Sequence, residues 1–261
     1  MEMEDIYQSF RDDVKSSILL AHSLIAMGSY GQEGILKQIE QYPEAGYQFV
    51  VPVQGTTEVG AAIVSHASNK DILSTYLSNP GAVQELVHAR LVQRWYDFLS
   101  QIFEHLFKSH FLGTKPCPST RSIKFEVDLD FSTDTSANLI DNLQERAVEG
   151  FRFFQSEKQL ETVEKMLGTK VAPDFKKDIK KHIVVRNIFQ HANGIVRPSD
   201  LALLGLTGKG ISLIDESARS KEFQAKSQLR ITFYELVKVG NDFCGAAKLL
   251  TTSPRSNTSP S

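Results

Sequence analysis

The feature that most constrains the fold of this chain is a wide apolar stripe along residues 82–111. The apolar side chains that recur there at helical spacing are Val83, Leu86, Val87, Leu91, Trp95, Phe98, Leu99, Ile102, Leu106 and Phe107. So wide a stripe predicts a long helix that is buried against more than one neighbour. The chain is therefore expected to be mainly α-helical.

Shorter patterns along the chain predict the remaining elements. Helices are predicted at 3–27, 35–41, 137–167 with a break near Gly150, 174–192 and 215–250. Strands are predicted at 47–51 and 211–214, and a half-buried strand or extended arm at 123–131, whereas 61–66 fits strand or helix.

A turn at 78–81 marks a boundary between two parts of the chain. We expect an N-terminal extension of helix and strand, of unknown role, at 1–80, and a helical domain with a few short strands at 81–250. The Ser/Thr/Pro-rich segment 251–261 is expected to be a disordered tail.

Composition excludes several classes of protein. With 29 Lys+Arg against 31 Asp+Glu, the net charge of −2 gives no support to nucleic-acid binding through overall charge. Two cysteines, Cys117 and Cys244, cannot build a disulfide scaffold or a cysteine zinc site. The first five residues are acidic where a secretory signal is basic, and the longest apolar run, 18–27, is too short to span a bilayer. We expect a soluble, cytoplasmic protein.

The segment 174–192 carries the most informative polar pattern. Asn187 and His191 are four residues apart and share one face of the predicted helix, while His182, Arg186 and Gln190 form a second row. Arg186 and His191 are therefore about 140° apart around the helix axis. They do not stack, but their rows are neighbours and can converge on one ligand.

The chemistry of these residues points to a phosphodiester. Asn193 and Gly194 end the helix just after His191, and a helix C-terminus favours the imidazolium form. An arginine that binds phosphate beside a histidine that moves a proton is what internal attack on a phosphodiester requires. The helix is also locally basic, so contacts to RNA are predicted from Lys177, Lys180, Lys181 and His182.

The stretch Arg186–His191 resembles the Arg-(polar)-x3-His signature of the HEPN superfamily of helical domains. The following residues 192–196 and the turn and strand at 208–213 are also similar to bacterial members, and the likeness covers about 82–250. The resemblance implies a helical bundle that forms a homodimer, in which two motif helices build one composite groove. Many members are metal-independent endoribonucleases of toxin–antitoxin or anti-phage systems.

Carried over to this chain, the resemblance assigns a role to each motif residue. His191 would be the general acid/base, Arg186 would stabilise the charge that develops on phosphorus, and Asn187 would orient the phosphate or the partner's histidine. The RNA 2′-hydroxyl would be the nucleophile and would leave a 2′,3′-cyclic phosphate. No metal or cofactor is expected; the expected partners are RNA, a second copy and, in a toxin or defence system, an antitoxin or another system protein.

Other interpretations remain open. The chain fits a non-catalytic HEPN-like module that binds nucleotide or RNA or mediates assembly, with 1–80 binding the partner. Arg186 and His191 also fit a solvated arginine and a helix-capping histidine. A metal-dependent hydrolase would use His105, His110 and the acidic segment 123–131, but the five-residue spacing of the histidines suits a shared metal poorly.

Overall fold

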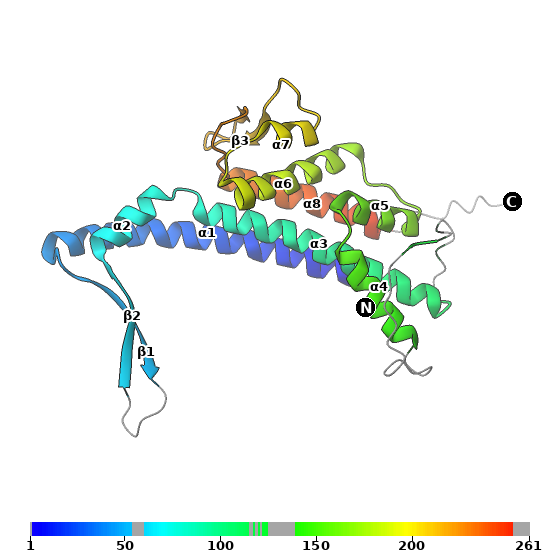
Figure 1. Ribbon diagram of the computed structural model, residues 1–261, viewed down its shortest axis with the longest axis horizontal. Coiled ribbons are helices and arrows are strands. Elements are labelled where there is room, and N and C mark those ends of the chain that lie inside the picture. The colour runs from blue at the N-terminus through cyan, green and yellow to red at the C-terminus, as the bar shows by residue number, and fades with distance from the viewer. Residues whose placement is uncertain are drawn as a thin grey trace. The chain divides into compact units, whose positions relative to one another are not determined.

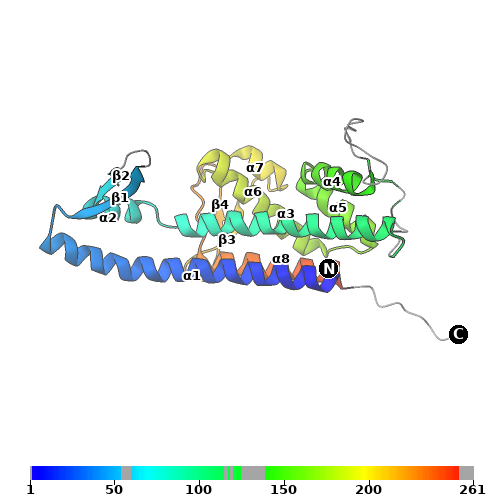
Figure 2. The ribbon, with the colours of Figure 1, turned by 90° about the horizontal axis from the view of Figure 1, so that it is seen from below.

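A computed structural model describes residues 2–53, 60–114, 117, 120, 122–124 and 139–252. Within these ranges the protein has eight helices and two antiparallel two-stranded sheets, so the prediction of a mainly helical fold is confirmed (Figures 1 and 2). The chain divides into two compact units: residues 1–19 together with 84–261, and residues 20–83.

The elements follow one another along the chain as two strand pairs set among helices. In order they are α1 (Met3–Gln41), β1 (Gly46–Val53), β2 (Gly60–Ser68), α2 (Asn69–Ser78), α3 (Ala82–Phe111), α4 (Leu139–Arg152), α5 (Ser156–Leu167), α6 (Pro173–Ala192), α7 (Pro198–Leu203), β3 (Ile211–Ile214), β4 (Ser220–Phe223) and α8 (Phe233–Thr251). None of the helices in the described ranges is both long and apolar enough to cross a membrane.

The core of the larger unit forms around α3. Trp95 is fully buried, and its ring lies 6.2 Å from that of Phe10 in α1 and 5.5 Å from that of Phe243 in α8, measured between centroids. Farther along α3, Phe103 stacks on Phe151 of α4 at 4.4 Å. Apart from Leu86, which is exposed, the wide stripe thus packs against several helices, as predicted.

Helix α8 approaches both α1 and α6 closely because small residues face them. A Cβ on Gly240 would lie 2.6 Å from Ile18 Cδ1, and a Cβ on Gly245 would lie 2.6 Å from Phe175 Cζ. Figure 1 shows α6 and α8 side by side. These two glycines therefore allow the helices to pack at short range.

The smaller unit consists of residues 20–41 of α1, the β1–β2 hairpin and α2. The two strands pair from Gly46–Ser68 to Val53–Gly60, with a bulge between Phe49 and Val50. Ser68 starts α2 through a capping box in which its hydroxyl accepts from Asp71 N at 3.1 Å. The strand predicted at 47–51 is thus confirmed, and the ambiguous segment 61–66 is a strand.

Two predicted boundaries are wrong. The first helix does not end at 27 but continues through Gly28, Gly31 and Gly34 to Gln41, since a glycine costs a helix only about 1 kcal/mol relative to alanine and does not break it. The last helix does not start at 215, because the Asp215 carboxylate accepts from Ser217 N and Arg219 N and forms a turn before β4.

Smaller differences concern α7 and the predicted break. The sequence pattern missed the short helix α7, which begins with Pro198 and in which Asp200 accepts from Arg197 N at 2.8 Å. The break expected near Gly150 falls at 153–155. The described residues leave out most of the expected strand at 123–131, the start of the helix predicted from 137 and nearly all of the tail.

The division into units also differs from the boundary expected near residue 80. Residues 3–19 of α1 belong to the larger unit, because Ile6, Phe10 and Val14 are buried in its core. The assignment of separate roles to residues 1–80 and 81–250 remains a prediction.

Candidate functional site

A cavity of about 630 Å³ lies between α3, α5 and α6. Helix α6 contributes Lys180, Arg186 and Asn187 to its wall, and α3 contributes Gln93, Tyr96, Asp97 and Ser100. The first turn of α5 and the residues before it contribute Arg152, Phe154, Gln155, Ser156, Glu157 and Gln159. Two of the three predicted catalytic residues and one predicted RNA-binding lysine therefore meet at one cavity.

Arg186 and Asn187 are joined by a hydrogen bond in this wall. Arg186 Nη1 donates to Asn187 Oδ1 at 3.2 Å, and both side chains are half-buried. No carboxylate among the described residues forms an ion pair with Arg186, and its Nε is covered from solvent without a hydrogen-bond partner. Within the described residues, the guanidinium is thus paired with an amide and not with a carboxylate.

His191 lies elsewhere on α6. Its side chain is exposed in the last turn and does not line the cavity. The helix ends as predicted, because Asn193 takes the left-handed conformation with φ of 49° and donates its N–H to Ile188 O. Within one chain, therefore, the structure does not bring His191 to Arg186.

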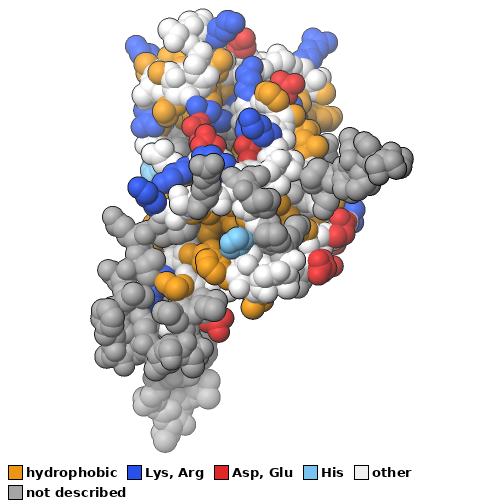
Figure 3. Space-filling view, turned by 90° about the vertical axis from the view of Figure 1, so that its right-hand side faces the viewer, with side chains coloured by type: hydrophobic (Ala, Val, Ile, Leu, Met, Phe, Trp, Pro, Cys, Tyr) orange, Lys and Arg blue, Asp and Glu red, His pale blue; other side chains and the backbone are white. Residues whose placement is uncertain are grey.

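Two of the lysines that were predicted to contact RNA form ion pairs with carboxylates of the chain itself. Lys180 Nζ pairs with Glu157 Oε1 at 2.7 Å at the cavity, and Lys181 Nζ pairs with Asp178 Oδ1 at 3.0 Å, while Lys177 is exposed. On the face shown in Figure 3, Lys and Arg side chains are interspersed with Asp and Glu side chains. The surface seen there is mixed in charge and is not a continuous basic patch.

His182 is fully buried, so the prediction that it contacts RNA is wrong. It occupies the side of α6 that faces α3 and α8, where its ring meets His88 with 3.3 Å between His88 Nε2 and His182 Nδ1. A side chain with no exposed atom cannot bind RNA directly. His182 belongs to the same row on the helix as Arg186 and Gln190, but of these three residues only Arg186 lines the cavity.

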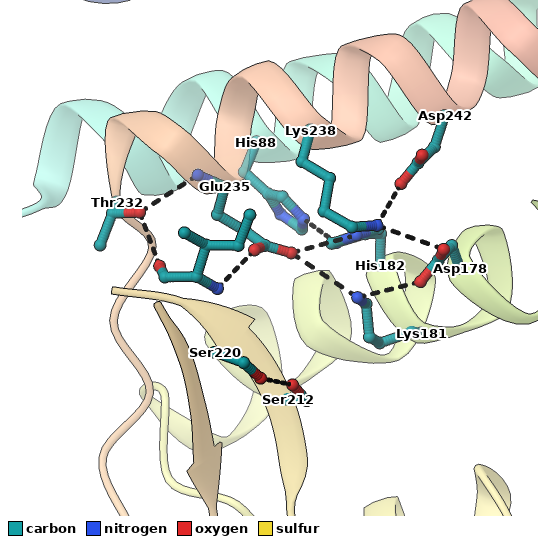
Figure 4. A network of polar contacts seen from close by, with 11 residues as sticks. His88, Asp178, Lys181, His182, Ser212, Ser220, Thr232, Glu235, Lys238 and Asp242 are labelled. Atoms are coloured by element: carbon teal, nitrogen blue, oxygen red, sulfur yellow. Dashed lines mark hydrogen bonds and ion pairs between the residues drawn. The ribbon is translucent and has the colours of Figure 1, made fainter. Parts of the chain in front are cut away.

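A buried polar network extends from this histidine pair (Figure 4). Glu235 Oε1 lies 3.4 Å from His182 Nε2 and 3.7 Å from Lys181 Nζ, and Glu235 Oε2 accepts from Ile214 N at 2.6 Å. The sequence pattern had assigned no role to His88 or Glu235, because each lies among apolar residues of its helix.

Burial dominates the protonation of this network. Loss of hydration lowers the pKa of His88 to about 3, helped by the charges of Lys181 and Arg186. It also lowers the pKa of His182 well below its ordinary value and raises the pKa of the Glu235 carboxyl. Both histidines are consequently neutral at pH 7, and neither can serve as a cation toward RNA.

Three side chains of this region have the chemistry of metal ligands. Ligand atoms of Asp178, His182 and Asp242 lie within 4.8 Å of one another. The Lys238 ammonium, however, pairs with Asp178 Oδ2 at 3.2 Å and with Asp242 Oδ2 at 2.5 Å. Lys238 thus pairs with both carboxylates, and Lys181 pairs with Asp178 as well, so these side chains do not fit a metal ion in this arrangement.

The metal site considered at 105–131 gains no support from the described part of the chain. His110 Nδ1 accepts from Cys117 N at 3.1 Å, which uses one of its two ring nitrogens. Asp128 and Asp130, the carboxylates of that interpretation, lie outside the described residues.

Comparison with known proteins gives no relative: no family model, no curated protein and no solved structure matches this chain. The residues and their geometry are therefore the whole basis for a functional proposal.

Proposed function

We propose that this protein is a metal-independent endoribonuclease of the HEPN type, which acts as a homodimer. The observation that carries the proposal is the wall of the α3–α5–α6 cavity, where Arg186 has no carboxylate partner among the described residues and is joined to Asn187. An unneutralised, half-buried guanidinium beside an amide is suited to hold a phosphate. His191, exposed on the same helix, supplies a group that transfers protons.

The proposed reaction is transesterification within the RNA. One His191 imidazole takes the proton of the 2′-hydroxyl, the 2′-oxygen attacks the adjacent phosphorus, and the bond from phosphorus to the 5′-oxygen breaks. A second histidine, protonated at the start, gives its proton to the leaving 5′-oxygen. Arg186 stabilises the extra negative charge on the phosphoryl oxygens in the transition state. The products are a 2′,3′-cyclic phosphate and a 5′-hydroxyl.

A dimer accounts for the separation of the two groups in one chain. Since His191 and Arg186 are about 140° apart around α6, a phosphate on Arg186 lies away from the histidine of the same copy. A twofold axis near the end of α6 would bring His191 of each copy toward Arg186 of the other. It would also supply the two histidines that the proton transfers require.

The test compares purified wild type, Arg186→Ala and His191→Ala on total RNA and transfer RNA in EDTA, read on denaturing gels with analysis of the RNA ends. Matched controls are Arg219→Ala and His66→Ala, since both residues are exposed and neither lines the cavity. We expect cyclic-phosphate ends with wild type and both controls, and loss of cleavage in both motif variants. Cleavage by His191→Ala, or cleavage that EDTA abolishes, would overturn the proposal.

The proposed cellular role, a toxin or an anti-phage effector in the cytoplasm, derives from the resemblance of Arg186–His191 to the family motif. Expression of wild type is then expected to arrest growth, whereas His191→Ala at the same protein level does not. Arrest by both proteins would show that the toxicity does not come from RNA cleavage.

A second candidate function is a non-catalytic module that binds RNA or nucleotide. The observation that favours it is the absence of His191 from the cavity wall, which leaves a phosphate site without a proton-transfer group in the single chain. RNA binding that depends on Arg186, by a dimer that leaves RNA intact under every condition of the test, would favour this alternative.

A further inference from the structure

The α3–α5–α6 cavity carries polar atoms that the chain itself leaves unpaired. Arg186 Nε and Gln159 Oε1 have no hydrogen-bond partner, and Gln159 is 2% exposed. The orientation of the Gln159 amide is fixed, because Nε2 donates to the carbonyl oxygens of Phe151 and Arg152 at 3.0 and 3.2 Å. Both atoms are covered from solvent, so they are unpaired polar atoms within the cavity wall, and such atoms are uncommon in folded proteins.

An aromatic ring lies on the same wall. Tyr96 of α3 is half-buried and lines the cavity together with Ser156 at the start of α5. Burial raises the pKa of this phenol, while the nearby charge of Arg186 acts in the opposite direction. Because the Tyr96 and Arg186 side chains line the same cavity, a ligand that fills it can reach both.

The size of the cavity limits the ligand. Its volume of about 630 Å³ falls in the range of pockets that hold one small organic molecule. A base pair of an A-form duplex cannot enter such a space, because its bases are stacked and the major groove is too deep and narrow for side chains to reach them. A single splayed nucleotide can enter it.

We propose that this cavity is a base pocket that binds one unpaired nucleotide of the RNA, with its phosphate on Arg186 and Asn187 and its base against Tyr96. Base stacking on aromatic rings is the common way in which proteins hold single-stranded RNA. The inference rests on the proposed function for the source of the nucleotide, and it defines the substrate as RNA with single-stranded stretches.

The test measures binding, not cleavage, and uses the full chain with His191→Ala, a residue outside the cavity wall. The probes are the four ribonucleoside monophosphates, a hairpin with an unpaired loop and a blunt duplex of the same stem. Each is titrated by calorimetry or by NMR. Tyr96→Ala and Tyr96→Phe are added in the same background, with Tyr234→Ala as the control, since Tyr234 is an exposed tyrosine of α8.

We expect at least one monophosphate and the hairpin to bind, and the duplex to bind more weakly than the hairpin. Tyr96→Ala should weaken binding about tenfold, the effect of losing one stacked base, whereas Tyr96→Phe and Tyr234→Ala should leave it within about twofold. Equal affinity for hairpin and duplex, equal effects of Tyr96→Ala and Tyr234→Ala, or no binding of any monophosphate would overturn the inference.

The outcome is separable from that of the cleavage assay. Binding that depends on Tyr96 together with an inactive wild type would retain the pocket and refute the nuclease. Cleavage by wild type together with binding that ignores Tyr96 would retain the nuclease and refute the pocket.

Discussion

The buried pair of His88 and His182 makes the stability of this protein depend on pH, and the variant His88→Gln isolates the contribution of one ring. In the folded protein the pKa of His88 is about 3, and in the unfolded chain it returns to the ordinary value of 6.5. As the pH falls below 6.5, the unfolded chain takes up a proton that folded His88 does not, so unfolding becomes more favourable. The stability that neutral His88 provides is therefore complete above pH 6.5 and is lost progressively between pH 6.5 and 3.

The magnitude follows from these two values. One pKa unit corresponds to about 1.4 kcal/mol, so going from pH 7.5 to pH 5 should remove about 2 kcal/mol through His88 alone. Glutamine has no proton to take up, so His88→Gln should lose about 2 kcal/mol less than wild type over the same range. His182, whose pKa is also lowered, and Glu235, whose raised pKa acts with the opposite sign, are present in both proteins and largely cancel in the comparison.

The assay is urea unfolding at pH 7.5, 6 and 5, followed by the fluorescence of Trp95, the single and fully buried tryptophan. Only the change of the unfolding free energy with pH is compared, because the substitution itself alters stability at every pH. Identical pH dependence of wild type and His88→Gln would refute the reasoning and would mean that the histidine pair is hydrated or charged in the folded protein.

Three further predictions concern packing and the half-buried ion pairs of Lys238. Gly245→Ala should lower the unfolding free energy by about 1–3 kcal/mol, because the new Cβ would lie 2.6 Å from Phe175 Cζ. In Gly31→Ala the new Cβ meets no atom within 4 Å, so the unfolding free energy from thermal unfolding should be unchanged or rise by about 0.5–1 kcal/mol. Phe103→Ala should cost about 3–5 kcal/mol in urea unfolding, since the ring is buried against Phe151, while Phe153→Ala, 83% exposed, should change stability by less than about 0.5 kcal/mol. Lys238→Ala should leave Asp178 and Asp242 without their shared cation, so that these carboxylates and His182 can bind Zn²⁺. Zn²⁺ should therefore raise the melting temperature of this variant but not of wild type. Equal shifts in both proteins would contradict the role assigned to Lys238.

Local sequence signals were sufficient for the helices that carry the core and the site. The bounds of α3 match the prediction because its apolar spacing continues without interruption from residue 82 and stops before Gly113, whose φ is +71°. The bounds of α6 match within one residue because Pro173 opens it and Asn193 closes it in the left-handed region. Apolar spacing, capping and backbone preference each act within one or two helical turns, so they can be recognised in the sequence alone.

Elements that depend on distant contacts were not predicted. The segment 215–232 has residues compatible with a helix, but Thr232 Oγ1 donates to Ile214 O and Glu235 accepts from Ile214 N, which ties β3 to the start of α8. These contacts join residues about twenty positions apart in the chain, so no local sequence pattern predicts them. The separation of α4 and α5 was predicted near Gly150, but it falls at 153–155, where the Gln159 side chain donates back to Phe151 O and Arg152 O.

For the candidate site, the sequence by itself determined which groups α6 carries and at what angle around its axis: Arg186 and Asn187 adjacent, His191 about 140° from Arg186. Only the tertiary structure decided which of them meet a ligand. His182 belongs to the same row as Arg186, yet His88, ninety-four positions earlier, closes over it, while the start of α5 and one side of α3 leave a cavity at Arg186. A helix face becomes core or site according to what packs against it, and that depends on contacts between residues far apart in the chain.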